Sequence, residues 1–155
     1  MKLVVQRVKE TRLEVDGQLI SEIKKGLAIY VGVAAGDSEK DVEYFAEKVV
    51  KLRIFEDENG KMNLSVTDIG GEILAISQFT LLADVSHGNR PGFSGAERPD
   101  RANELYEHFC DKVASLGVPV KKGVFGADMK ILQLNDGPVT IIYGDSCTVP
   151  STIPG

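Results

Sequence analysis

The stretch Leu13-Glu14-Val15-Asp16-Gly17-Gln18-Leu19-Ile20 predicts a β-hairpin near the amino terminus. Two short runs flank Asp16-Gly17, a dipeptide that accepts the positive φ angles of a tight two-residue turn. Before the hairpin, Leu3 to Val8 follow the two-residue period of a strand. After it, Leu27 to Val33 form an apolar run of the length of one buried strand. The first third of the chain therefore predicts a β-sheet.

Two amphipathic helices are expected at separate places in the chain. Ser38 is positioned to cap the first helix, with Asp41 three residues later as its reciprocal partner. The apolar residues of this helix recur at helical spacing and are Val42, Phe45, Val49 and Leu52. The second helix is expected from about Asp100 to Leu116, with Gly117 as its stop. Its inward residues are expected to be Ala102, Leu105, Phe109, Val113 and Leu116.

The middle of the chain, Glu72 to Leu82, predicts a long inner strand because it is rich in Ile, Leu and Phe. A loop from Ala83 to Pro99 follows, and a loop of this length in a compact domain is often functional. The closing strands are expected at Val118–Val124, Lys130–Leu134 and Val139–Tyr143. Strands and helices do not alternate strictly, which favours an α+β domain with a largely antiparallel, barrel-like sheet and two main helices.

The length of 155 residues fits one domain, expected over residues 1–147, with a loosely ordered tail at 148–155. No signal peptide or membrane span is visible, so we expect a cytoplasmic protein that does not bind membranes. Cys110 and Cys147 lack the CxxC spacing of redox or metal sites. Cys110 lies on the apolar side of the second helix and is expected to be a buried, reduced thiol.

The net charge is −5, from 18 basic and 23 acidic residues. This balance argues against a protein that coats DNA or RNA through a broad basic surface. It is compatible with a local grip on a short RNA end. The charge therefore limits the mode of nucleic-acid binding, and DNA is not an expected partner.

The side chains of common catalytic sites are scarce. His87 and His108 are the only histidines, too few for a zinc site and poorly placed for a serine triad. No Walker-type or GxGxxG loop is present. The sequence thus predicts no metal and no cofactor. An enzyme of this kind would act on an activated substrate, through oriented backbone N–H groups and a positioned water.

Two short segments carry distinctive chemistry. Ser77-Gln78-Phe79-Thr80-Leu81 offers hydroxyls, an amide and a flat apolar wall at the end of a strand. Asn135-Asp136-Gly137-Pro138-Val139-Thr140 contains a rigid Gly-Pro turn, and X–Pro bonds are the common site of cis peptides. By pattern alone, the first segment is also compatible with an ordinary alternating strand and the second with an ordinary hairpin turn.

Together the two segments resemble the SQFTL and NxGPVT motifs of the D-aminoacyl-tRNA deacylase family. The similarity continues in family order through further segments: Val4-Gln6-Arg7-Val8, Leu52–Phe55, Met62–Ser65, Gly88–Pro91 and Gly123–Met129. Two departures lower the positive charge or polarity of the long loop, Ser86-His87 where lysines are common and Gly92 where serine is common. These departures bear on tRNA affinity and not on the reaction.

The resemblance implies the fold of that family and a homodimer with active sites at the subunit interface. It implies hydrolysis of the ester between a D-amino acid, or glycine, and the 3′ end of tRNA. It further implies a cis Gly-Pro bond that enters the partner's pocket. There, Gly137 and Pro138 (the Gly-Pro gate) would reject L-amino acids by collision with backbone.

The same resemblance implies roles for other residues. The catalytic positions are Ser77, Gln78, Phe79 and Thr80, which line the terminal adenosine and the scissile ester. The substrate-binding positions are Gly137, Pro138, Phe125, Met129, Arg7 and Asn135, with Arg7 steadying the Gly-Pro gate. Alternative hypotheses are a non-catalytic module that binds a metabolite or RNA end, and a hydrolase of another acyl ester.

Overall fold

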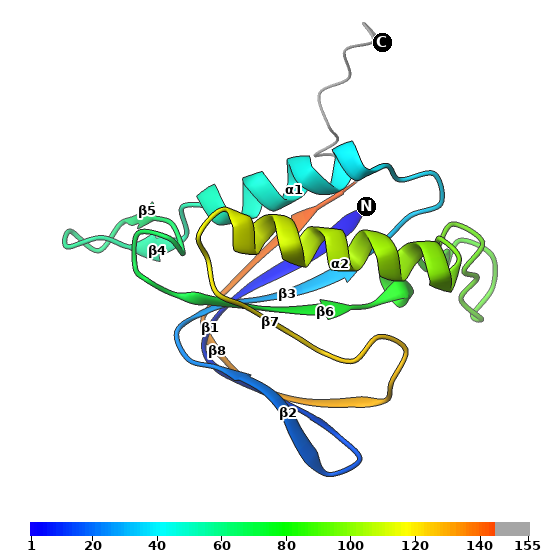
Figure 1. Ribbon diagram of the computed structural model, residues 1–155, viewed down its shortest axis with the longest axis horizontal. Helices are drawn as coiled ribbons and strands as arrows, with labels where there is room; N and C mark the ends of the chain where they lie inside the picture. The colour runs from blue at the N-terminus through cyan, green and yellow to red at the C-terminus, as the bar shows by residue number, and fades with distance from the viewer. Residues whose placement is uncertain (145–155) are drawn as a thin grey trace, which may run out of the picture.

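The computed structural model describes residues 1–144 as a curved sheet covered on one side by two helices (Figure 1). Its elements are β1 (Lys2–Val15), β2 (Gln18–Ile23), β3 (Gly26–Gly32), α1 (Glu39–Lys51), β4 (Phe55–Glu56), β5 (Met62–Leu64), β6 (Glu72–Ser77), the 3-10 helix η1 (Phe79–Leu82), α2 (Pro99–Ser115), β7 (Val120–Lys122) and β8 (Met129–Tyr143). The expected tail at 148–155, the domain boundary at 147 and Cys147 lie outside the described residues. Within residues 1–144, no helix is long and apolar enough to span a membrane.

The predicted hairpin is confirmed, and its first strand is central to the sheet. Asp16 and Gly17 have φ angles of 51° and 77°, as the tight turn requires. Beyond the hairpin partner β2, β1 pairs antiparallel with β3 through its first half and with β8 over nearly its full length. The long strand β1 therefore has three neighbouring strands, β2, β3 and β8.

The sheet is mixed, which corrects the expectation of a largely antiparallel one. β6 pairs parallel with both β3 and β7, whereas every pair that includes β1 is antiparallel. The physical reason is that a long connection containing a helix, α1 before β6 and α2 before β7, returns the chain to the same end of the sheet. The barrel-like character is confirmed, since the outermost strands β2 and β7 approach through a hydrogen bond from Ser21 Oγ to Lys122 O.

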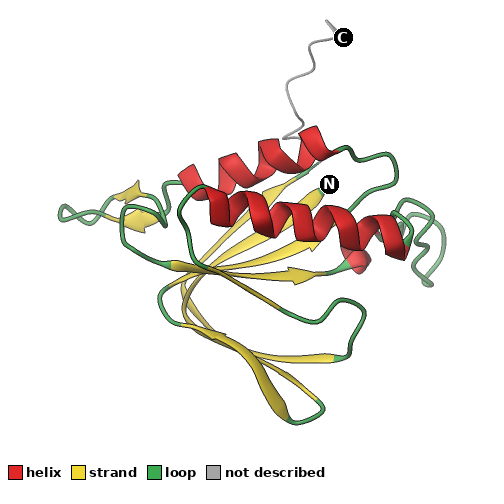
Figure 2. Cartoon of the chain, viewed as in Figure 1, coloured by secondary structure: helices red, strands yellow, loops and turns green. Residues whose placement is uncertain are grey.

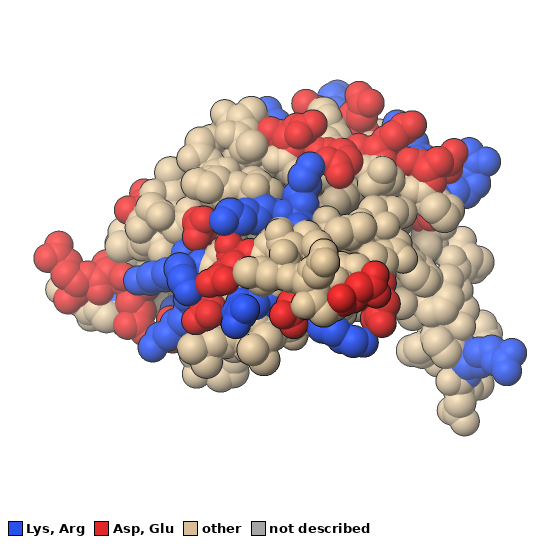
Figure 3. All heavy atoms as spheres, turned by 60° about the horizontal axis from the view of Figure 1, so that its bottom comes forward, with Lys and Arg blue, Asp and Glu red and all other residues tan. Residues whose placement is uncertain are grey.

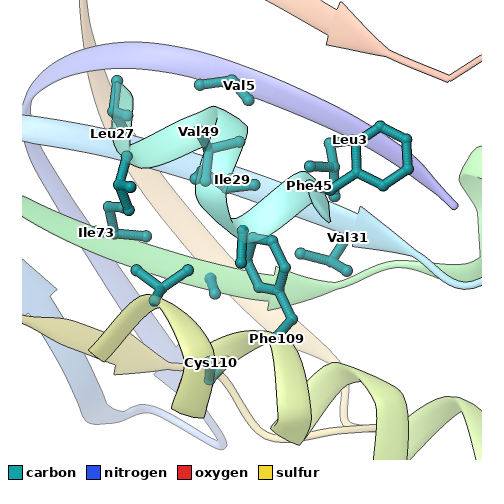
Figure 4. Packing of buried hydrophobic residues seen from close by; sticks show 14 of the residues in the cluster. Leu3, Val5, Leu27, Ile29, Val31, Phe45, Val49, Ile73, Phe109 and Cys110 are labelled. Atoms are coloured by element: carbon teal, nitrogen blue, oxygen red, sulfur yellow. The ribbon is translucent and has the colours of Figure 1, made fainter. Parts of the chain in front are cut away.

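Both predicted helices are confirmed and lie on the same side of the sheet (Figure 2). Ser38 and Asp41 form the expected reciprocal capping box at the start of α1. Gly117, with a φ of 94°, follows the end of α2. Figure 4 shows Phe45 of α1 and Phe109 of α2 packed among the strand residues of the main core. Cys110 is buried and free in that core, and burial raises the pKa of its thiol to about 12.

Three expected strands differ from the structure, at two places that bear on the candidate site. The strand predicted over Glu72–Leu82 ends at Ser77, and Phe79–Leu82 turn into η1. The strands predicted at Lys130–Leu134 and Val139–Tyr143 are one strand, β8, so the Gly-Pro segment is not a hairpin turn. In both places a polar motif interrupts regular pairing, because its side chains or its proline do not continue the ladder.

Candidate active site at the end of strand β6

A cavity of about 740 Å³ opens beside the carboxyl end of β6. Its walls come from the ends of β3 and β6, from η1, from the long loop and first turn of α2, and from the segment between β7 and β8. The lining residues are Tyr30, Val33, Ile76, Ser77, Gln78, Phe79, Thr80, Phe93, Ala96, Glu97, Arg98, Pro99, Ala102, Phe125, Gly126, Ala127, Asp128, Met129 and Ile131. This mixture of apolar walls with a few polar groups is typical of a small-ligand site.

The turn from β6 into η1 brings the first motif onto the cavity wall. Gln78 N still donates to Val31 O of β3 at 2.8 Å, and the chain leaves the sheet at that point. The side chain of Gln78 turns back, and its Nε2 donates to Thr80 Oγ1 at 2.9 Å. Phe79 is 56% exposed and meets Phe93 of the long loop edge to face, with ring centroids 5.0 Å apart. The motif is thus displayed at the mouth of the cavity.

The same turn leaves two backbone donors without protein partners. Among the described residues, the N–H groups of Phe79 and Thr80 donate to no protein acceptor. Gly32 of β3 permits the close turn, because a Cβ there would lie 3.1 Å from Gln78 O and 2.6 Å from Leu82 Cδ2. Both residues line the cavity, and two adjacent unpaired N–H groups are an arrangement that can stabilise an oxyanion.

Three charged residues line the cavity among the described residues, and they are Glu97, Arg98 and Asp128. Arg98 is the one Lys or Arg among the described residues that line the cavity. Beside it, the carboxylate of Glu97 accepts from the backbone N–H groups of Arg98 at 3.0 Å and Gly36 at 3.2 Å. These backbone hydrogen bonds lower the pKa of Glu97, so its carboxylate is a poor proton acceptor. Asp128, in the segment between β7 and β8, pairs with Lys130 at 3.2 Å.

Neither histidine belongs to the cavity wall. His108 lies on α2 with its Nε2 3.7 Å from Glu43 Oε1 of α1, and His87 lies in the long loop. Thr80 therefore has no imidazole beside it, and its Oγ1 already accepts a hydrogen bond from Gln78. The site lacks the adjacent base that activates a hydroxyl nucleophile.

The Gly-Pro segment lies in a bulge of β8 that wraps one buried arginine. Four residues, Asp136 to Val139, stand opposite Arg7 alone, since Asn135 pairs with Val8 and Thr140 with Gln6. Arg7 is 7% exposed, and its Nε donates to Asp136 O at 3.0 Å. Its Nη1 donates to Ile54 O at 2.7 Å. The Gly137–Pro138 bond is cis, as the resemblance implies.

The structure thus divides the predicted site residues into two groups. Ser77, Gln78, Phe79, Thr80, Phe125 and Met129 all line the cavity. Arg7, Asn135, Gly137 and Pro138 are absent from its lining and gather along the β1–β8 seam. Within one chain, the two motifs form two separate sites.

Several residues of the cavity wall were not predicted from the sequence. They are Tyr30, Phe93, Glu97, Arg98 and Asp128. The unusual length of the loop over Ala83–Pro99 was a usable signal for three of them, since that loop forms one wall. Tyr30 gave no signal, because one tyrosine in an apolar strand has the pattern of a core residue.

Comparison with known proteins assigns the chain to a family. A family model described as D-Tyr-tRNA(Tyr) deacylase matches residues 4–144. The chain belongs to this family. A solved structure titled "c-Myc DNA Unwinding Element Binding Protein" is 40% identical, with 94% of this chain and 99% of that chain covered and a TM-score of 0.89. The D-Tyr-tRNA(Tyr) deacylase family acts on aminoacyl-tRNA as a hydrolase, and the resemblance found in the sequence is confirmed.

A second solved structure bears on the fold. It is titled "Structural Analysis of a probable eukaryotic D-amino acid tRNA deacylase" and is 17% identical, with a TM-score of 0.78. The match covers 92% of this chain and 97% of that chain. At this identity the match shows a shared fold, and the predicted deacylase fold is confirmed.

Replacing Arg7 with Met is expected to destabilise the chain by about 3 kcal/mol, because two largely buried carbonyls, Ile54 O and Asp136 O, lose their donor. Urea unfolding measures the change. The control is Arg12→Met, because Arg12 is exposed and pairs with Glu22 only at 3.7 Å. It is expected to cost less than about 1 kcal/mol. Equal losses in the two variants would contradict the structural role of Arg7.

Proposed function

We propose that this chain hydrolyses the ester bond between a D-amino acid, or glycine, and the 3′ end of tRNA, releasing free amino acid and tRNA. The observation that carries the proposal is the free N–H pair of Phe79 and Thr80 on the wall of the cavity beside β6. Membership of the D-Tyr-tRNA(Tyr) deacylase family supports the substrate class. The enzyme is then a carboxylic ester hydrolase that needs no cofactor.

The proposed reaction uses water as the nucleophile. Water attacks the ester carbonyl carbon, and the carbonyl oxygen takes up negative charge facing the N–H groups of Phe79 and Thr80. The bond from this carbon to the ribose oxygen then breaks, and the ribose oxygen receives a proton. The neighbouring hydroxyl of the terminal ribose is available to assist. Because the aminoacyl ester is already activated, positioning and oxyanion stabilisation suffice.

The other cavity residues have proposed roles in binding. Phe125 and Met129 shape the space for the adenine and the amino acid, and Phe79 supplies a flat wall at the mouth. Arg98 is placed to meet the phosphate that joins the terminal nucleotide to the rest of the RNA. Ser77 and Gln78 contact the terminal adenosine and the ester.

Selectivity is proposed to come from a second copy of the chain. The Gly-Pro gate lies outside the cavity of its own chain, so it acts on the cavity of a partner in a homodimer. Among the described residues, β8 pairs only with β1, and its outer surface exposes three large apolar side chains: Leu132, Leu134 and Ile142. An exposed apolar strand of this kind favours association with another chain. Asn135 precedes the gate and contributes to its placement.

The gate would distinguish amino acids by collision. The carbonyls of Gly137 and Pro138 meet the amino group of a D-aminoacyl ester, whereas an L side chain is driven against backbone. Glycine has no side chain to collide and passes. Rejection of this kind needs a rigid element, and Arg7 provides rigidity by bonding to Asp136 O from inside the sheet.

The name of the 40% identical neighbour suggests DNA binding as a second function. The face of this chain shown in Figure 3 mixes acidic and basic side chains and carries no continuous basic surface. The net charge is −5. Both observations disfavour duplex coating and favour a local grip on one nucleotide end.

The direct test compares hydrolysis of D-Tyr-tRNA and L-Tyr-tRNA by the purified chain. The D form is expected to be hydrolysed at least about a hundredfold faster, which corresponds to about 2.7 kcal/mol of difference between the two barriers. Light scattering on the same sample is expected to give the mass of two chains. Equal rates on the two esters, or no hydrolysis of the D form, would overturn the proposal.

Thr80→Ala tests whether water or the hydroxyl is the nucleophile. Activity on D-Tyr-tRNA is expected to stay within about tenfold of wild type, because the backbone N–H of residue 80 remains and only the hydroxyl is lost. The matched variant Thr67→Ala removes a hydroxyl outside the cavity and is expected to leave the rate unchanged. Complete loss of activity in Thr80→Ala alone would make Thr80 the nucleophile.

Gly137→Ala tests the gate. The φ of Gly137 is 132°, and an added Cβ would lie 2.8 Å from Val139 N and 3.2 Å from Arg7 Nη2. The gate must shift, and we expect the preference for D-Tyr-tRNA over L-Tyr-tRNA to fall about tenfold. Gly60→Ala is the control, since Gly60 also has a positive φ but has open space around it. An unchanged preference in Gly137→Ala would contradict the gate.

A further inference from the structure

A chain of side-chain hydrogen bonds runs from the cavity wall to the Gly-Pro gate of the same chain. It starts at Tyr30 on β3, whose hydroxyl donates to Gln133 Oε1 of β8 at 3.0 Å. Gln133 Nε2 donates to Gln6 Oε1 of β1 at 2.6 Å and also to Asn135 Oδ1. Gln6 Nε2 completes the chain by donating to Thr140 Oγ1 at 3.4 Å. We call Tyr30, Gln133, Gln6, Asn135 and Thr140 the polar relay.

Gln133 is the branching point of the polar relay, because its amide makes three hydrogen bonds to three different side chains. Its oxygen accepts once, and its two N–H donors go to two different oxygens. The opposite orientation of the amide would direct its oxygen at the acceptors of Gln6 and Asn135. Every bond therefore points the same way, from the phenol toward the bulge, which is the arrangement in which neighbouring hydrogen bonds strengthen one another.

The relay ends on both sides of the gate. Asn135 is the last residue of β8 that pairs with β1 before the bulge over Asp136–Val139. Thr140 is the first residue that pairs with β1 after it. Arg7 bonds to the bulge from the core face, where Ile54 O is its other acceptor. The relay fixes the two ends of the bulge while Arg7 fixes its first carbonyl.

The other end of the relay belongs to the cavity. The ring of Tyr30 lines the cavity beside Ile76 and Ile131, whereas Gln133 is absent from the lining. Burial raises the pKa of Tyr30, so its hydroxyl stays protonated and available as a donor. A group that reaches the cavity therefore shares a rigid polar connection with the gate.

We propose that Tyr30 and Gln133 are positioning residues that tie the Gly-Pro gate to the wall of the chain's own cavity and thereby determine chiral selectivity. This inference rests on the proposed function. Because the gate serves the partner's cavity in the proposed dimer, the relay links the two active sites: the cavity of one subunit supports the gate that enters the other. Selectivity then depends on residues that do not touch the substrate, of which Gln133 is the clearest.

The test uses Tyr30→Phe, Gln133→Leu and the double variant. Tyr30→Phe retains the ring in the cavity and removes only the donor, and Gln133→Leu removes the branching amide outside the cavity. For each chain, kcat and KM are measured separately on D-Tyr-tRNA and L-Tyr-tRNA. Two matched controls are Tyr44→Phe, which removes a phenol on α1, and Gln18→Leu, which removes an exposed glutamine of β2.

Both single variants are expected to lower the preference for D over L by about fivefold to tenfold. Gln133→Leu, which lies outside the cavity lining, is expected to leave kcat on D-Tyr-tRNA within about threefold. The double variant is expected to lose no more selectivity than either single variant, because the two residues act in one connection. The controls are expected to keep the wild-type preference. A role of Tyr30 confined to packing against substrate would raise KM in Tyr30→Phe and leave Gln133→Leu normal, which overturns the proposal.

A measurement independent of activity separates this proposal from the proposed function. The backbone amide resonance of Gly137 in a labelled sample is expected to move in Tyr30→Phe and in Gln133→Leu but not in Tyr44→Phe. An unmoved resonance overturns the relay even if the chain is an active and selective deacylase. A wild-type chain without preference for D-Tyr-tRNA overturns the proposed function, and the resonance then still decides whether the cavity wall and the bulge are connected.

Discussion

The pairing of β1 with β8 is the interaction on which both halves of the site depend. β1 joins β2, β3 and β8, so its register decides where each neighbouring strand ends. Backbone pairing between β1 and β8 is interrupted at Arg7, opposite the bulge. There the buried guanidinium of Arg7 donates hydrogen bonds to two backbone carbonyls. A buried charge is costly without partners, but here two carbonyls accept its N–H groups, so the cost is offset and the bulge has one shape.

The cavity beside β6 depends on a second interruption of regular pairing. β6 pairs with β7 as far as Ala75 and with β3 as far as Ser77, and the chain then coils into η1 above Gly32. Because the strand ends there, the N–H groups of Phe79 and Thr80 are not part of the sheet ladder. The fold and the proposed chemistry are therefore connected at Ser77, which ends strand β6 and also lines the cavity.

Helices, strands and tight turns were predicted from the sequence more accurately than the places where strand pairing is interrupted. The Asp16-Gly17 turn and the capping box at Ser38 were predictable, because each follows from the local chemistry of two residues. The parallel pairs of β6 were not, since the direction of a strand depends on how distant segments pack. The residues of the first motif line the cavity, whereas the separation of the Gly-Pro segment from it is a property of the folded chain. Tyr30 and Gln133 were missed because hydrogen bonds between distant strands leave no periodic pattern.

Placing the gate and the cavity on separate parts of one chain has a physical consequence for selectivity. Rejection by collision works only if the colliding backbone moves less than the intruding side chain, which requires support on several sides. Arg7 supports the bulge from the core, and the polar relay supports its two ends from the other face of β1. Within the bulge, Gly137 and Pro138 are exposed, and neither carries a charged group. If the proposed gate acts in this way, the stiffness of the bulge would account for discrimination between mirror-image substrates by a site with few reactive side chains.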